Sequence, residues 1–332
     1  MKKIKIGQIG TLHDHSSGKL ECVRKYPEIF EIVGVVAEND EVKKEKQLMP
    51  HYSGIRWMTE KDLFSVSDLD AVLVEGFELD LLNIAQRCID RGLHIHLDKP
   101  AGNDITAFEK LLNDAKNKNL TVQLAYMYRY NTAVQYCINM VKSGKLGEIT
   151  GIEAAMCTEH SVEKNKWLEK FQGGIMFFLG CHLVDLVYMI GGIPNNIVTF
   201  NKQTNLNGTH SIDNGLAVFE YDKYAATIRL NSTEVNGYGR RQLVVCGSEG
   251  TVEIKPLENP TKMTVSLKSL TNGNIYNDVK ENITPDKMDG RYDAMMLDFA
   301  KFVWGEKDNP YSYAYELQLQ KMILKACDFE IN

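Results

Sequence analysis

The sequence lacks three features that would place it outside the ordinary globular proteins. Its seven cysteines are odd in number and none is spaced as C-x-x-C, which is typical of free thiols in a reducing compartment rather than of a disulfide framework. No uninterrupted apolar run approaches membrane-spanning length. Basic residues are not in excess, since the net charge is −6, and this argues against a polyanion-binding surface. We therefore expect a cytoplasmic protein that binds neither nucleic acid nor a membrane.

The chain length predicts more than one folding unit. A chain of 332 residues exceeds what a single hydrophobic core comfortably organises, so two domains are expected. Hydrophobic residues make up 44% and charged residues 25% of the sequence, which are the values of a globular protein. Because the pattern of the sequence changes after residue 124, we predict domains at 1–124 and 125–332.

Strand-like and helix-like segments alternate in the first domain. The strand-like ones, such as 31–37, are almost continuously apolar, as strands buried on both faces of a parallel sheet are. The alternation predicts an α/β Rossmann domain, a doubly wound parallel sheet with right-handed crossovers. Strands are expected at 3–9, 31–37, 55–58, 70–74 and 120–124, and directly before Lys99.

The second domain has a different pattern. From about 197 to 267 strand-like segments follow one another without intervening helices, which favours an antiparallel sheet. We therefore predict a C-terminal α+β domain with an open, mostly antiparallel sheet. Its helices are expected at about 131–143, 179–190, 288–304 and 313–329.

The turn after the first strand has only part of a dinucleotide-binding fingerprint. Gly10 holds the first glycine position of G-x-G-x-x-G, but Leu12 and His15 stand at the second and third. A glycine turn that opens a helix binds pyrophosphate through backbone N–H groups and the helix dipole. The alternative interpretation of these residues is a plain strand–turn–helix that binds no nucleotide. Glu38, at the end of the second strand, would accept the ribose 2′-hydroxyl and favour NAD over NADP.

The His13-Asp-His15 sequence offers a competing interpretation as a metal pair. Histidines two residues apart can chelate, and His96 or Asp98 could complete a site. The hydrolases that use H-x-H need further ligands on later strands of a barrel, and the element order here is not that of a barrel. We therefore expect no metal and interpret these residues as polar caps of a helix N-terminus.

Five motifs, in order, carry a family resemblance. Asp98-Lys99-Pro100 is similar to an E-K-P motif, and 125–131 is similar to a G-Y-x-x-R-F-N segment. Residues 143–148 match S-G-x-L-G-E, 173–185 resemble G-G-G…G-x-H-x-x-D, and 247–251 match G-x-x-G-T. With these landmarks the chain resembles the glucose–fructose oxidoreductase/inositol dehydrogenase (Gfo/Idh/MocA) family over nearly its whole length.

The resemblance implies an NAD(P)-dependent oxidoreductase that transfers hydride to or from a hydroxyl or keto carbon of a sugar, cyclitol or derivative. It also implies a homodimer or homotetramer built through the C-terminal sheet. Oxidising an alcohol requires a base for the hydroxyl proton and a cation near the developing alkoxide. Lys99 would polarise the oxygen, His182 would act as acid and base because imidazole titrates near neutral pH, and Asp185 would orient His182.

The resemblance also supplies the remaining site residues. The expected cofactor-binding residues are Gly10, Thr11, Leu12, His13, Glu38, Glu75, Gly76, Asp98, Lys99 and Arg129. The expected substrate-binding residues are Tyr126, His160 and Trp167.

The sequence departs from the family pattern at several positions, which keeps two alternatives open. Phe178 stands where many members have an aspartate, and Glu75-Gly-Phe77 replaces an A-T-P segment. One alternative is a glycosidase or lyase that oxidises its substrate only transiently. The other is a dinucleotide-binding sensor without turnover. Leu12 and His15 at glycine positions and the apolar Phe178 suggest this alternative.

Overall fold

The computed structural model describes residues 2–258, 261–271, 273, 276 and 278–331. Contacts divide the chain into two compact units, residues 1–127 with 288–320 and residues 128–287 with 321–332. The predicted second domain included 288–320, whereas the contacts group this segment with the first unit. Each unit is described by itself below.

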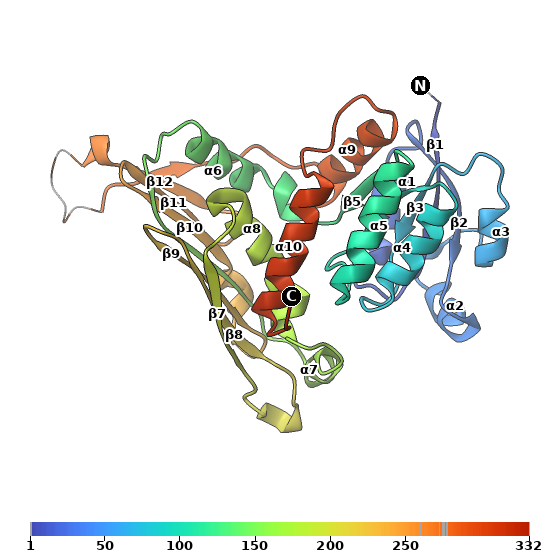
Figure 1. The fold of residues 1–332 in the computed structure, drawn as a ribbon, viewed down its shortest axis with the longest axis horizontal. Coiled ribbons are helices and arrows are strands. Elements are labelled where there is room, and N and C mark those ends of the chain that lie inside the picture. Colours follow the sequence, from blue (N-terminus) through green and yellow to red (C-terminus); the bar gives the residue numbers. More distant parts are fainter. Residues whose placement is uncertain (1, 259–260, 272, 274–275, 277, 332) are drawn as a thin grey trace. The chain divides into compact units, whose positions relative to one another are not determined.

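The first unit is built on a parallel sheet with strand order β2-β1-β3-β4-β5 (Figure 1). The predicted doubly wound parallel sheet is therefore confirmed. The last residues of all five strands pair in one row, because Ile9 is in register with Val36 and Val74, Val74 with Leu97, and Leu97 with Leu124. The strands are β1 (Ile4–Ile9), β2 (Phe30–Val36), β3 (Ala71–Val74), β4 (His94–Leu97) and β5 (Val122–Leu124).

The helices of the first unit connect these strands. Side chains of Asn39, Thr59 and Asp104 accept backbone N–H bonds at the starts of α2, α3 and α5, the ordinary N-cap chemistry. α4 packs on α5 and α1 contacts α9; right-handed connections place α1 on the opposite face from α4 and α5. The helices are α1 (Ser16–Arg24), α2 (Asp40–Lys46), η1 (Pro50–Tyr52), α3 (Glu60–Phe64), α4 (Leu81–Asp90), α5 (Ile105–Asn117) and α9 (Asp293–Val303).

The strand predicted at 55–58 is wrong. Trp57 forms only an isolated parallel bridge with Val35, and Met58 N–H donates to the Val35 carbonyl at 2.9 Å. The next residue, Thr59, accepts from Asp62 N–H at 3.1 Å and starts α3. A helix cap therefore ends the extended segment before it can pair as a strand.

The second unit is built on a sheet that has the order β13-β12-β11-β10-β6-β9-β8-β7 over the described residues. Only the β6–β9 pair is parallel there, so the predicted mostly antiparallel sheet is confirmed. Its strands are β6 (Ile149–Cys157), β7 (Asn196–Lys202), β8 (Asn214–Glu220), β9 (Ala225–Asn231), β10 (Gln242–Gly247), β11 (Gly250–Ile254), β12 (Met263–Leu267) and β13 (Glu281–Ile283).

One apolar helix supports this sheet. α8 packs on β6 and β9, and Cys181–Val187 within it are all buried. The helices of the unit are α6 (Thr132–Lys142), α7 (Val162–Leu168), the π-helical turn η3 (Met176–Gly180) and α8 (Cys181–Gly191), and α10 (Tyr313–Ala326) belongs partly to each unit. Short turns are η2 (Met127–Tyr130), η4 (Leu206–Gly208), η5 (Gly237–Arg240) and η6 (Lys268–Leu270).

Two further properties concern the cysteines and the length of the apolar helices. The seven cysteines are unbridged. No helix within the described part of the chain is both long enough and apolar enough to cross a bilayer.

Candidate functional site

Polar residues of the first unit gather where the parallel strands end. Gly10 follows β1, Glu75 follows β3 and Asp98 follows β4, and Glu38 comes two residues after the end of β2. Because the strand ends lie in one row, these residues share one edge of the sheet. Doubly wound folds bind their ligands at this carboxyl edge.

The turn after β1 requires glycine at one position only. Gly10 has φ +93°, and a Cβ there would lie 2.2 Å from the backbone nitrogen of Gly76. His15 has φ −94°, and Leu12 is not among the residues of positive φ. The fingerprint positions held by Leu12 and His15 therefore do not need glycine for the backbone to fold.

The beginning of α1 is compatible with an anionic ligand. Its first turn contains no acidic residue, and its N-cap residue His15 makes no side-chain capping bond. N–H groups at a helix start attract phosphate through their partial positive charge. These features fit the pyrophosphate of a dinucleotide.

Glu38 provides a carboxylate that is fixed in place. Its oxygens accept from Thr11 N–H at 2.8 Å, from the Thr11 hydroxyl at 2.9 Å and from Leu12 N–H at 3.1 Å. Three donors hold one conformation of the side chain. A ribose diol is a pair of hydrogen-bond donors, and an oriented carboxylate suits it.

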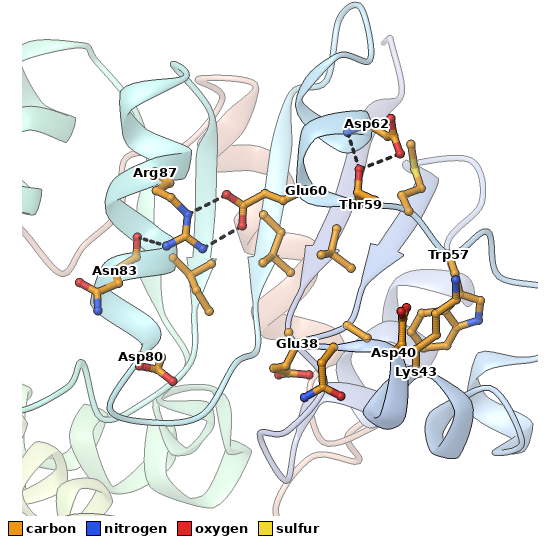
Figure 2. A pocket seen from close by; sticks show the side chains of 17 residues that line it. Glu38, Asp40, Lys43, Trp57, Thr59, Glu60, Asp62, Asp80, Asn83 and Arg87 are labelled. Atoms are coloured by element: carbon orange, nitrogen blue, oxygen red, sulfur yellow. Dashed lines mark hydrogen bonds and ion pairs between the residues drawn. The ribbon is translucent and has the colours of Figure 1, made fainter.

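Gly10 and Glu38 line a cavity of about 840 Å³ (Figure 2). Figure 2 shows Glu38, Asp40, Lys43 and Trp57 along one side of it, and Asp80, Asn83 and Arg87 on the other. Between the two sides, Arg87 forms a bidentate ion pair with Glu60, with Nε–Oε1 at 2.7 Å and Nη2–Oε2 at 2.8 Å.

The lining of this cavity is predominantly acidic. Arg87 is already paired with Glu60, which leaves Lys43 as the other cation of the lining. The two cations face five carboxylates, those of Glu38, Asp40, Glu60, Asp62 and Asp80. An additional phosphate would enter a negative field here.

Beneath the turn lies a buried ionic cluster centred on Asp98. Lys19 Nζ lies 2.6 Å from Asp98 Oδ2 and 3.2 Å from Glu75 Oε1, and all three side chains are fully buried. Burial alone would raise the pKa of Asp98, but His13, Lys19 and His15 outweigh it and hold the pKa well below its usual range. Burial, together with the Asp98 charge, raises the pKa of Glu75 well above its ordinary value.

Both histidines of the H-x-H sequence reach this cluster. His15 Nδ1 lies 3.3 Å from Asp98 Oδ1, and His13 Nδ1 lies 3.1 Å from Asp98 Oδ2. Burial lowers the pKa of His13 well below its ordinary value and lowers that of His15 to about 4. Both imidazoles are therefore neutral at physiological pH.

The same three residues have the chemistry of a metal-ligand set. One ligand atom each from His13, His15 and Asp98 can be chosen so that all lie within 4.8 Å of one another. The Lys19 ammonium, at 2.6 Å from Asp98 Oδ2, already brings a positive charge to the carboxylate. A divalent cation would have to enter beside that charge, which is unfavourable. The absence of a metal stays a prediction.

Lys99 directly follows Asp98 and is fully buried. Its backbone N–H donates to Asp98 Oδ1 at 2.7 Å, and its carbonyl lies 3.1 Å from His13 Nε2. The His13 side chain thus connects the predicted catalytic lysine to the turn after β1.

In the second unit, His182 lies in the first turn of α8 and is buried. The ring of Tyr128 meets it edge-on, with centroids 5.1 Å apart. The Tyr128 hydroxyl donates to Glu258 Oε1 at 2.6 Å, and Arg241 Nη1 donates to the same oxygen at 3.1 Å. Tyr128 is therefore held by a buried ion pair that the sequence did not indicate.

Asp185 and Arg129 form a buried ion pair with each other. Arg129 Nε donates to Asp185 Oδ2 at 2.9 Å and Nη2 donates to Oδ1 at 2.8 Å, and the two side chains are 2% and 1% exposed. The sequence assigned Asp185 to catalysis and Arg129 to the cofactor. The structure shows that the two charges neutralise each other.

Two of the three predicted substrate residues belong to one aromatic cluster. Phe178 lies edge-on to Trp167, with centroids 5.1 Å apart, and 6.4 Å from the His160 ring. Lys164 Nζ stands 3.4 Å from the Trp167 centroid. The third predicted residue, Tyr126, is buried in the first unit.

Comparisons with known proteins agree with these observations. Residues 134–253 match a family model described as the GFO/IDH/MocA C-terminal domain. Over 155 residues the chain is 26% identical to the uncharacterized oxidoreductase YhhX of Escherichia coli, a match that covers 46% of this chain and 45% of the relative. The matches to curated relatives thus span about half of those proteins' length.

Solved structures share the fold over almost the entire chain. UDP-N-acetylglucosamine 3-dehydrogenase GnnA from Acidithiobacillus ferrooxidans is 16% identical, with a TM-score of 0.77 over 98% of this chain and 97% of its own. KijD10, a 3-ketoreductase from Actinomadura kijaniata in complex with TDP-benzene and NADP, is 16% identical, with a TM-score of 0.79 over 98% and 96%. At these identities the likeness establishes the fold.

Proposed function

We propose that the chain is a nicotinamide-dependent oxidoreductase of the Gfo/Idh/MocA family, whose C-terminal domain model its residues 134–253 match. The proposed reaction moves a hydride to or from a hydroxyl or keto carbon of a sugar, cyclitol or derivative. The observation that carries the proposal is the fixed Glu38 carboxylate and the buried Lys99 at one carboxyl edge of the sheet. The nicotinamide cofactor, when bound, supplies the hydride acceptor or donor.

The residues of the chain supply charge and proton transfer. The Lys99 ammonium stabilises negative charge on the substrate oxygen, a role that gains strength from a site without water. His182 accepts the hydroxyl proton in oxidation and returns it in reduction. Lys99 belongs to the first unit and His182 to the second, and each role is proposed for its residue separately.

The cavity favours NAD over NADP. The 2′-phosphate of NADP would approach Glu38, whose carboxylate is already fixed by Thr11 and Leu12, in a lining that holds five carboxylates and two cations. We expect NAD⁺ to bind about tenfold or more tightly than NADP⁺, which is about 1.4 kcal/mol. KijD10, by contrast, was solved in complex with NADP.

A sugar-like substrate is supported by the aromatic cluster of the second unit. Trp167 is half-buried and, with Phe178 and His160, combines apolar ring faces with polar groups, as small-molecule sites do. GnnA is a UDP-N-acetylglucosamine 3-dehydrogenase and KijD10 is a 3-ketoreductase. Both are consistent with oxidoreduction at a carbinol carbon.

The cofactor part is tested by calorimetry with NAD⁺ and NADP⁺ on the wild-type chain and on Glu38→Gln. We expect the NAD⁺ preference to fall in Glu38→Gln and to be unchanged in Glu45→Gln, whose side chain is exposed on α2. Failure of both dinucleotides to bind would refute the proposed function.

The reaction is tested with a panel of hexoses, inositols and sugar nucleotides while NADH absorbance is followed. We expect NADH to accumulate in proportion to product and Lys99→Ala to lose at least about 100-fold in kcat, the range of an electrostatic or acid–base group. Lys116→Ala, at an exposed position of α5, is the control. Product formation without net NADH would instead indicate transient oxidation followed by elimination.

We also propose self-association through the sheet of the second unit. Val198 and Phe200 on β7 are 43% and 49% exposed, which is unusual for large apolar side chains and typical of interfaces. Light scattering of the full chain should give the mass of a dimer or tetramer, and a monomer at micromolar concentration would contradict this.

A further inference from the structure

The backbone of Lys99 is held on both sides by side chains. On one side Asp98 Oδ1 accepts the Lys99 N–H at 2.7 Å. On the other side the Lys99 carbonyl lies 3.1 Å from His13 Nε2. All three residues are buried, with 0% exposure for Asp98 and Lys99 and 2% for His13. We call this pair of bonds the Lys99 clamp.

The partners of His13 fix which ring nitrogen carries the proton. Its Nδ1 accepts from the backbone N–H of His15 at 3.2 Å. Asp98 Oδ2 also lies 3.1 Å from Nδ1 and by itself would favour a proton on that nitrogen, but Nδ1 already accepts the His15 N–H and Nε2 faces the Lys99 carbonyl. Because a neutral imidazole has one donor and one acceptor nitrogen, we assign the proton to Nε2. Glu78 Oε1, 3.6 Å from the same Nε2, favours the same tautomer. His13 is therefore a donor to Lys99.

The other side of the clamp is anchored by a buried cation. Asp98 accepts from Lys19 Nζ at 2.6 Å through Oδ2 and from the Lys99 N–H through Oδ1, and His15 Nδ1 lies 3.3 Å from Oδ1. A carboxylate bound by several donors of this kind has little freedom to rotate. Lys19 thus fixes Asp98, and Asp98 fixes the N–H of Lys99.

We propose that His13 is a positioning residue for Lys99, which holds the carbonyl of the lysine while Asp98 and Lys19 hold its N–H. This inference rests on the proposed function, because it assigns to the clamp the presentation of the Lys99 ammonium to substrate. It gives a role to the turn that differs from cofactor binding. The turn after β1 carries an imidazole that reaches across the end of β3 to Lys99, the second residue after β4.

The test compares His13→Ala, which removes the donor, with His13→Gln, whose amide N–H can occupy the place of Nε2. His94→Gln is the matched control, because His94 lies at the other end of β4 and accepts from Thr121 N–H at 2.9 Å. Thermal melting selects the variants that remain folded. The readouts are amide hydrogen exchange of the peptide around Lys99, the NAD⁺ dissociation constant, and kcat and KM on the best substrate of the panel.

We expect the exchange of the Lys99 peptide to accelerate about tenfold in His13→Ala, as loss of one modest buried hydrogen bond allows. In the same variant kcat should fall about tenfold or more while KM and the NAD⁺ affinity stay within about twofold. His13→Gln should recover most of both losses, and His94→Gln should behave as the wild type.

The proposal is overturned by an exchange rate in His13→Ala equal to that of the wild type. It is equally overturned by a loss of turnover that follows NAD⁺ affinity, or by His13→Gln being no better than His13→Ala. Other measurements would show that the proposed function is wrong. These are calorimetry in which the wild-type chain binds no dinucleotide, and assays in which the Lys99→Ala variant stays active. Hydrogen exchange requires neither cofactor nor substrate, so it tests in every case whether His13 holds the Lys99 backbone.

Discussion

The Arg129–Asp185 pair allows a sharp test of how the second unit is stabilised. Both charges are buried and joined by hydrogen bonds of 2.8 to 3.1 Å. Asp185→Asn preserves the volume of the side chain but leaves the guanidinium without a counter-charge. Breaking one partner of such a pair costs about 3–5 kcal/mol, because the remaining ion stays desolvated. We expect Asp185→Asn and Arg129→Met each to lower the unfolding free energy of the second unit by this amount.

The double variant distinguishes charge pairing from packing. Replacing a buried pair by apolar residues of similar size is often neutral or stabilising. Arg129→Met combined with Asp185→Leu should therefore lie within about 1 kcal/mol of the wild type. With the single variants Arg129→Met and Asp185→Leu, the double-mutant cycle should give a coupling energy above about 2 kcal/mol.

Unfolding in guanidinium chloride can be followed in the second unit alone. Of the three tryptophans, Trp57 and Trp304 belong to the first unit and Trp167 to the second, so a background of Trp57→Phe and Trp304→Phe leaves one local fluorescent probe. Two units need not unfold as one, and the probe removes this ambiguity. Single losses below 1 kcal/mol, or losses that simply add in the double variant, would refute the account of a buried pair.

Two further predictions concern the first unit. Burial lowers the pKa of His96 to about 3, so the histidine stabilises the fold fully above its unfolded pKa of about 6.5 and progressively less as the pH falls toward 3, by up to about 1.4 kcal/mol per pH unit. His96→Gln should thus lose less stability between pH 7.5 and 5 than the wild type or the exposed variant His210→Gln in urea titrations, and equal losses would contradict the linkage. Gly10→Ala should lower the melting temperature more than Gly54→Ala does. Both glycines have positive φ, but of the two only Gly10 would place a Cβ against backbone, at 2.2 Å from Gly76 N. Equal melting temperatures would disprove this close approach.

The sequence predicts the two sheets well because their signals are local. Near-continuous apolar strands such as 31–37 and alternating strand-like segments need only hydrophobic periodicity to be recognised, and β2 was found at Phe30–Val36. The failure at 55–58 also has a local cause, since the cap at Thr59 starts α3. Helix α7, at Val162–Leu168, was not predicted, although Ser161 caps it by accepting from Lys164 N–H.

The candidate site was less predictable because its contacts join distant residues. Lys19 meets Asp98 across 79 positions, and Tyr128 meets Glu258 across 130. No spacing rule connects such pairs. One signal was available for Lys19: a charged residue among the buried positions of α1, beside Leu20, where a lysine needs a counter-charge. The assignment of Lys99 and His182 to catalysis stays a prediction.

The incomplete fingerprint and the Lys99 clamp have a common physical origin. Backbone geometry demands glycine only at Gly10, while the later turn positions have φ values open to any residue. Side chains at His13 and His15 can therefore point to Asp98 without straining the turn. An aspartate, shorter than the glutamate of E-K-P, bonds the N–H of the very next residue. The departures from the family pattern on these two segments thus fit one another, as expected if they replace one way of fixing the lysine by another.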